Sequence, residues 1–256
     1  GKEHLKEEGA PMKRIWIKNA RLIDGTGAPA SMTDVIVEGD RILSVGEPGT
    51  PSDTVIDAAG KGVCPGFVDI HRHCDAKFLQ DSDFGKVMLA QGITTTVVGN
   101  CGMSLTPSPA DPAEMYDFME AVLGSGCEKL GLHDYQDYVS ALRSRPLPVN
   151  AASMVGTGSV KITVKGFADT PYTEAELQKA AALIENALNA GAVGVSCGIM
   201  YLPECYSTTD EFAGILKPLG KAGRVLTAHI RGEGDSLVSS VKEIIEIGKK
   251  AGCPVE

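Results

Sequence analysis

The sequence predicts an α/β protein in which a short β-rich segment precedes part of a (β/α)8 barrel. Residues 14–63 contain short apolar runs separated by turn residues, whereas from residue 64 onward apolar runs alternate with helical patterns. Such alternation implies a parallel sheet covered by helices. No GxGxxG or GxxxxGKS/T motif follows an apolar run, and polar residues gather just after the predicted strands, where barrels hold their chemistry.

The β-rich segment is expected to span residues 12–63. The preceding residues 1–11, GKEHLKEEGAP, are charged and unpatterned, and we interpret them as a flexible tail or a remnant added for expression, with Met12 as the natural start. Three stretches have the composition of strands: RIWIKNARLID, DVIVEGDRILSVG and DTVIDAAG. The turn Glu38-Gly39-Asp40 between two apolar runs predicts a hairpin. A segment this short buries too little apolar surface to be stable alone.

Residues 64–256 are expected to form the barrel part. Predicted strands cover residues 67–73, 94–100, 150–155, 192–196 and 225–229, and a sixth begins at CPVE. Their nearly continuous apolar character is typical of strands that are covered on both faces. A barrel must close to remove its sheet edges. Five strands and the start of a sixth therefore predict that this chain is the amino-terminal part of a longer protein.

Helical patterns fill the intervals between these strands. Three helices are predicted in most detail, over residues 173–189, 208–223 and 236–250. The first begins with a capping box formed by Thr173 and Glu176, and the second with one formed by Thr208 and Glu211.

Charge and cysteine content exclude several classes of function. The net charge of −9, with acidic residues spread along the chain, argues against a nucleic-acid or anionic-membrane partner, which would require a basic face. No apolar run is long enough to cross a bilayer, and no signal-peptide pattern opens the chain. Seven cysteines without CxxC spacing predict neither a zinc ribbon nor a thioredoxin motif. A reducing cytoplasm is the expected location.

The stretch GFVDIHRHCD ends the first predicted barrel strand with two histidines. In an extended strand Asp69, His71 and His73 point to one side, while Val68 and Ile70 point outward against helices. Both imidazoles would then project into the barrel mouth and could share a metal ion. The alternative is a pair of ordinary polar residues at a strand end.

Cys101 follows the second predicted strand, and His229 ends the fifth. Cys101 lies at the barrel mouth in GITTTVVGNCG, one strand along from the histidine pair; the alternative is a buried structural cysteine, which is how we interpret the other six. A thiolate and imidazoles form a ligand set suited to Zn²⁺. Tyr201 and Tyr206, after the fourth strand, line the pocket or only pack a loop.

Longer motifs around these residues resemble the amidohydrolase superfamily, and more narrowly the N-acyl-D-amino-acid deacylases (D-aminoacylases). The resemblance runs from about residue 12 to the end. Its motifs are NARLIDGTG, PGFVDIHRHCD, QGITTTVVGNCGMSLTP, GAVGVSCGIMYLPECYSTTDEF and LTAHIRGEGDSLVSSVKEIIEIG. It implies a metal-bearing (β/α)8 barrel joined to a small β-sandwich built from both chain ends, of which residues 12–63 would be the amino-terminal half.

The resemblance also implies roles for individual residues. Cys101 and His229 match ligands of a tightly held zinc, and His71 and His73 match a second, weaker metal position. Tyr201 matches the tyrosine that helps to hold the substrate carboxylate. The implied reaction is zinc-dependent hydrolysis of an N-acyl-D-amino acid to a D-amino acid and a carboxylate.

The resemblance is not complete. A sixth-strand histidine and the aspartate used as general acid and base would follow residue 256, so no residue here is assigned to proton transfer, and the 256 residues alone are expected to be inactive. GTGSVK stands where Gly-His-Gly followed by an arginine is expected, so Thr157 and Lys161 mark a departure.

Two other functions remain open from the sequence. Hydantoinases and dihydroorotases, which are cyclic-amide hydrolases, bridge two metals with a lysine that GAVGVSCG lacks, and Cys101 could take that role. A non-catalytic scaffold with the same fold is the other alternative, against which the four ligand candidates argue. The expected partner is a small-molecule substrate. The sequence does not decide whether one or two metals bind, which side chain the substrate carries, or whether the protein forms a homo-oligomer.

Overall fold

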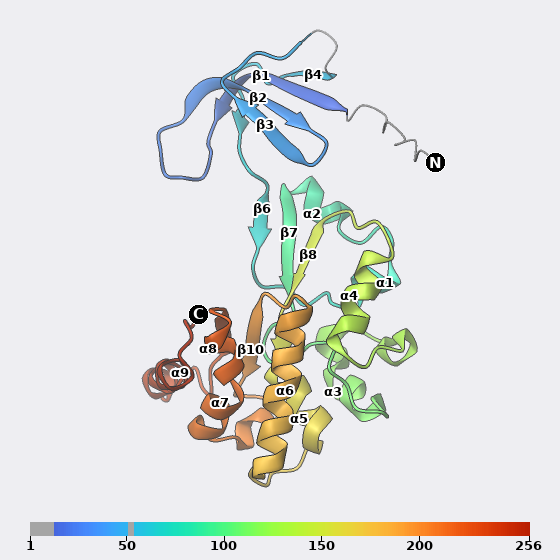
Figure 1. Ribbon diagram of the computed structural model, residues 1–256, viewed down its shortest axis with the longest axis vertical. Coiled ribbons are helices and arrows are strands. Elements are labelled where there is room, and N and C mark those ends of the chain that lie inside the picture. Colours follow the sequence, from blue (N-terminus) through green and yellow to red (C-terminus); the bar gives the residue numbers. More distant parts are fainter. Residues whose placement is uncertain (1–12, 51–53) are drawn as a thin grey trace, which may run out of the picture. The chain divides into compact units, whose positions relative to one another are not determined.

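Two compact units make up the chain, Gly1–Gly66 and Phe67–Glu256. The computed structural model describes residues 13–50 and 54–256 (Figure 1). The predicted tail, residues 1–11, lies outside the described residues.

The first unit is a five-stranded sheet. The strands are β1 (Arg14–Leu22), β2 (Ser31–Glu38), β3 (Arg41–Val45), β4 (Thr54–Asp57) and β5 (Gly62–Val63). Their order is β3-β2-β1-β4, with β5 also paired to β1. β1 runs antiparallel to β2 and parallel to β4 and β5. The predicted hairpin is confirmed, because β2 and β3 pair antiparallel with Glu38 opposite Arg41.

The second unit contains parallel strands that follow one another in chain order. They are β6 (Phe67–Asp69), β7 (Ile93–Val98), β8 (Asn150–Ser153), β9 (Val155–Gly156), β10 (Gly194–Gly198) and β11 (Val225–His229). β7 lies between β6 and β8, and β10 lies between β9 and β11. Only Met154 separates β8 from β9, and Leu226 forms a further parallel bridge with Val255. This consecutive parallel order is the one that a (β/α)8 barrel requires.

The first barrel strand is shorter than predicted. β6 ends at Asp69, so His71 and His73 lie in the loop that follows and not on the strand. The Asp69 carboxylate accepts hydrogen bonds from the His71 N–H at 3.3 Å and from Arg72 Nε at 2.6 Å, while the Arg72 N–H still donates to Val97 O of β7 at 3.1 Å. The prediction that Val68 and Ile70 pack against helices is wrong for this structure. Both are more than half exposed, because β6 pairs only with β7.

Helices connect the strands of this unit. They are α1 (Lys77–Gln80), α2 (Lys86–Ala90), α3 (Ala113–Leu123), α4 (Tyr135–Arg143), α5 (Thr157–Lys165), α6 (Glu174–Ala190), α7 (Thr209–Ile215), α8 (Lys217–Lys221) and α9 (Leu237–Ala251), with short 3-10 helices η1 (Cys127–Leu130) and η2 (Glu204–Tyr206). Both predicted capping boxes are present, at Thr173 and Thr208. The predicted helix 208–223 is instead divided into α7 and α8 at Leu216. Pro218 explains the break, because it has no N–H to donate within a helix.

A buried core joins the strands to the later helices. Val195 of β10 and Leu226 of β11 are fully buried against Ile184 of α6 and Ile247 of α9. Burying side chains of this size stabilises the fold by about 1.5–3 kcal/mol each. This core fixes the carboxyl ends of β10 and β11, from which two of the predicted site residues follow. No helix within residues 13–50 and 54–256 has the length and apolar character needed to cross a membrane.

Candidate metal centre

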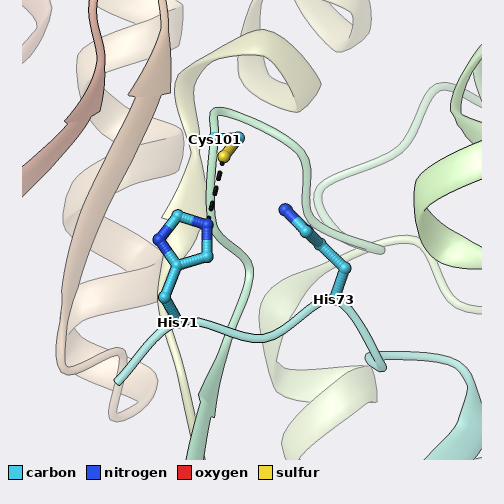
Figure 2. A group of neighbouring side chains, drawn as sticks. All are labelled: His71, His73 and Cys101. Carbon is cyan, nitrogen blue, oxygen red and sulfur yellow. Dashed lines mark hydrogen bonds between the residues drawn. The ribbon is translucent and has the colours of Figure 1, made fainter. Parts of the chain in front are cut away.

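His71, His73 and Cys101 form one group of side chains. One potential ligand atom from each lies within 4.8 Å of the others. Figure 2 shows the two imidazoles rising from one loop toward the turn that carries the thiol. The two rings meet edge to face, with centroids 5.4 Å apart. The group therefore forms although the two histidines lie beyond the strand.

Cys101 sits in a tight turn after β7. Its φ is +56°, in the left-handed region that non-glycine residues rarely occupy, and Gly102 follows with φ +74°. The side chain is buried, and its Sγ lies 3.3 Å from His71 Nε2. Two hydrogen bonds of Ser196 Oγ stabilise the turn: the hydroxyl donates to Gly99 O at 2.5 Å and accepts from the Gly102 N–H at 2.9 Å.

His229 reaches the same thiol from another strand. It is the last residue of β11, paired in register with Gly198 of β10. Its Nδ1 lies 3.9 Å from Cys101 Sγ, and its Nε2 lies 3.6 Å from Glu233 Oε1. Cys101 is thus the side chain that lies between His71 and His229.

Tyr201 points its hydroxyl at this group. The oxygen lies 3.2 Å from His229 Nδ1, and the two rings are 4.7 Å apart. Gly198 O accepts from the Tyr201 N–H at 2.9 Å, so the tyrosine is held by the turn that ends β10. The structure places Tyr201 beside the candidate ligands, and its role in holding a carboxylate stays a prediction.

Burial shifts two side chains of this group toward their neutral forms. Burial, together with the charges of His71 and His229, lowers the pKa of His73, which keeps that imidazole neutral. The His73 Nδ1 is buried without a hydrogen-bond partner. Burial raises the pKa of the Cys101 thiol. A bound cation would satisfy the unpaired nitrogen and stabilise the thiolate, so these residues fit a zinc ion.

A small cavity opens beside these side chains. It has a volume of about 140 Å³ and is lined by Ile70, His71, Asn100, Cys101, Thr227, Ala228, His229 and Glu256. A larger cavity of about 730 Å³ lies between α3 and η1, and none of the predicted site residues lines it. Of these two cavities, the smaller is therefore the one that the candidate ligands His71, Cys101 and His229 line.

Two acidic residues near the centre were not singled out from the sequence. Glu233 contacts His229 from four residues further along the chain, and its position in the motif HIRGEGD was the only signal. Glu204 is buried against the turns that carry Cys101 and Tyr201. No sequence pattern indicated that Glu204 is buried near the site, because an acidic residue after a proline in a loop is ordinarily solvated.

Comparison with known proteins agrees with this geometry. Residues 54–255 match the model of a family described as the amidohydrolase family. The chain belongs to the amidohydrolase family. It is 35% identical over 243 residues to D-aminoacylase from Alcaligenes xylosoxydans xylosoxydans, an alignment that covers 94% of this chain and 49% of that protein. The predicted resemblance to the D-aminoacylases is confirmed.

Solved structures of similar proteins show the same fold. The structure of N-acyl-D-glutamate deacylase from Bordetella bronchiseptica, complexed with zinc and a phosphonate inhibitor, matches with a TM-score of 0.87 and 35% identity, covering 96% of this chain and 51% of that one. L-hydantoinase from Arthrobacter aurescens matches with a TM-score of 0.55 at 17% identity, covering 95% of this chain and 52% of that one, which shows the fold alone. The chain spans about half the length of the curated relatives that it matches.

Proposed function

We propose that the full-length protein is a zinc-dependent hydrolase that cleaves the amide bond of N-acyl-D-amino acids. The observation that carries this proposal is the position of Cys101, whose Sγ lies 3.3 Å from His71 Nε2 and 3.9 Å from His229 Nδ1. Sulfur and imidazole nitrogen are the donors that zinc prefers. β10 spans Gly194–Gly198 and contains no lysine. In this part of the chain, the Cys101 thiolate is therefore the anion that would take the bridging role of such a lysine.

The similar proteins support the same reaction. D-aminoacylase and N-acyl-D-glutamate deacylase are named for this chemistry, and the latter binds zinc together with a mimic of the tetrahedral intermediate. We further propose that residues 12–63 belong to a small β-sandwich and residues 64–256 to the amino-terminal part of the catalytic barrel. We also propose that the protein is cytoplasmic, and that its partner is a small-molecule substrate and not nucleic acid or a membrane.

In this proposal Cys101, His71, His73 and His229 hold the metal. Bound zinc supplies a Lewis acid for the acyl carbonyl and lowers the pKa of a bound water. His73, which burial keeps neutral, would offer a nitrogen lone pair to the metal, and Cys101 would offer its sulfur as the thiolate, with its proton released to solvent. Tyr201 directs its hydroxyl at the site and would donate it to the substrate carboxylate.

The test is a deacylation assay on the full-length protein loaded with zinc. A panel of N-acyl-D-amino acids with acidic, apolar and polar side chains is compared with the matching L-compounds, and free amino acid is measured. We expect release from D-substrates, loss of release with a chelator, and recovery with zinc. No release from any D-substrate would contradict the proposal, and turnover of hydantoin or dihydropyrimidine instead would identify a cyclic-amide hydrolase.

A further inference from the structure

We propose that Glu204 is a positioning residue that holds the turns of Cys101 and Tyr201 in place through hydrogen bonds. This inference rests on the proposed function, in which both side chains serve the metal centre. Glu204 begins η2 and only 2% of it is exposed, although it follows the exposed Leu202 by two residues. A carboxyl group buried this deeply requires partners that offset its lost hydration.

The first set of partners fixes the end of β10. Glu204 Oε2 accepts a hydrogen bond from the Gly198 N–H at 3.1 Å. Gly198 O in turn accepts from the Tyr201 N–H, and Tyr201 O accepts from the Cys205 N–H at 2.8 Å. The loop between residues 198 and 205, which carries Tyr201, is therefore closed by these three hydrogen bonds, one of them to the Glu204 carboxyl group.

The second set of partners reaches α5. Thr157 Oγ1 makes a short hydrogen bond with Glu204 Oε1 and lies 3.2 Å from Ser196 O. Thr157 is itself 1% exposed. When Glu204 is protonated, its O–H can donate a hydrogen bond to Thr157 Oγ1 while the Thr157 hydroxyl donates to Ser196 O, so the neutral carboxyl group has a partner for its hydrogen.

Direct packing links Glu204 to the Cys101 turn. A Cβ placed on Gly102, the residue after Cys101, would overlap Glu204 Oε2. A Cβ placed on Gly198 would overlap Cys101 O and come within 2.7 Å of the Tyr201 ring. These distances put Glu204 in van der Waals contact with the Cys101 turn and with the end of β10. Loss of the Glu204 side chain would leave a void beside the Cys101 turn, whose backbone is in the left-handed region.

The environment of Glu204 favours the neutral acid. Burial raises the pKa of Glu204 to about 7, although the Thr157 hydroxyl, the Gly198 N–H and the nearby Lys161 charge oppose this effect. Glutamine has nearly the same shape as neutral glutamic acid. Its amide oxygen can accept from Gly198, and its NH2 group can donate to Thr157. Glutamine at this position should therefore preserve the positioning, whereas alanine should not.

The experiment measures zinc affinity of the full-length protein by competition with a chelator, for wild type, E204A, E204Q and L219A. Leu219 is a matched control, because it is fully buried in the core around α6, α7 and α9 and its truncation removes a similar number of atoms. Removing groups that orient metal ligands weakens metal binding by about 10- to 100-fold. We expect a loss of that size in E204A and a change of less than about threefold in E204Q and L219A.

A second readout follows the thiolate itself. With cobalt in place of zinc, the charge-transfer absorption from Cys101 should weaken in E204A and stay unchanged in L219A. Equal affinity in E204A and L219A would overturn the inference, and so would an E204Q protein that binds as weakly as E204A. Both readouts measure binding and not turnover, so a failure of the proposed activity does not enter them.

Discussion

Replacing Glu204 by glutamine is expected to make the free energy of unfolding less dependent on pH. The cause is the contrast between the buried carboxyl group and the same group in the unfolded chain. The pKa of this side chain is raised from 4.5 to about 7 in the fold, chiefly by burial. Between these two values the folded protein keeps a proton that the unfolded chain has lost, so wild-type stability falls as pH rises through this window.

The size of the effect follows from the two pKa values. At about 1.4 kcal/mol for each tenfold change, the span from 4.5 to about 7 corresponds to about 3 kcal/mol. Glutamine has no proton to lose, so E204Q avoids this cost. Relative to wild type, E204Q should gain about 2–3 kcal/mol between about pH 5 and about pH 8.

The assay is urea unfolding of metal-free protein across this pH range, followed by circular dichroism. Asp75 is also fully buried with a pKa raised to about 7, so wild type alone does not isolate Glu204. The difference between E204Q and wild type cancels the Asp75 contribution. A difference that stays constant with pH would refute the reasoning, because it would mean that Glu204 is ionised in the fold or that water reaches it.

Three further predictions concern the metal, the substrate and the fold. Because burial raises the pKa of Cys101, zinc binding should release the thiol proton. Zinc affinity, measured by chelator competition, should therefore strengthen about tenfold for each pH unit near neutrality. An affinity that does not change with pH would contradict this. Y201F should raise KM for N-acyl-D-amino acids about tenfold or more with a smaller change in kcat, and an unchanged KM in steady-state kinetics would argue against the carboxylate contact. T173A should lower the free energy of unfolding in urea by about 1 kcal/mol, and no loss would show that the α6 capping box is dispensable.

Much of the fold could be predicted because its signals are local. The capping boxes at Thr173 and Thr208 mark helix starts within four residues, and Gly39 marks the hairpin between β2 and β3. Lengths were less predictable, since they depend on side-chain contacts that a pattern does not reveal. β6 ends at Asp69, where its carboxylate accepts from the His71 N–H, and Pro218 divides the helix that follows Thr208.

The gathering of the site residues was predictable for a topological reason. Carboxyl ends of consecutive parallel strands meet at one edge, which brings Cys101 after β7 and His229 at the end of β11 close together. Glu204 could not be predicted in the same way. Its burial depends on the nearby end of β10 and on two segments that are distant in sequence, the Cys101 turn and Thr157 of α5.

X-ray absorption at the zinc edge, recorded on the zinc-loaded full-length protein and on its C101S variant, tests the central claim most directly. We predict a sulfur shell at about 2.3 Å together with nitrogen at about 2.0–2.1 Å in the wild type. The sulfur shell should disappear in C101S, because the other candidate ligands, His71, His73 and His229, offer only nitrogen. A wild-type spectrum without sulfur, or a sulfur shell that persists in C101S, would contradict the assignment of Cys101 as the thiolate ligand.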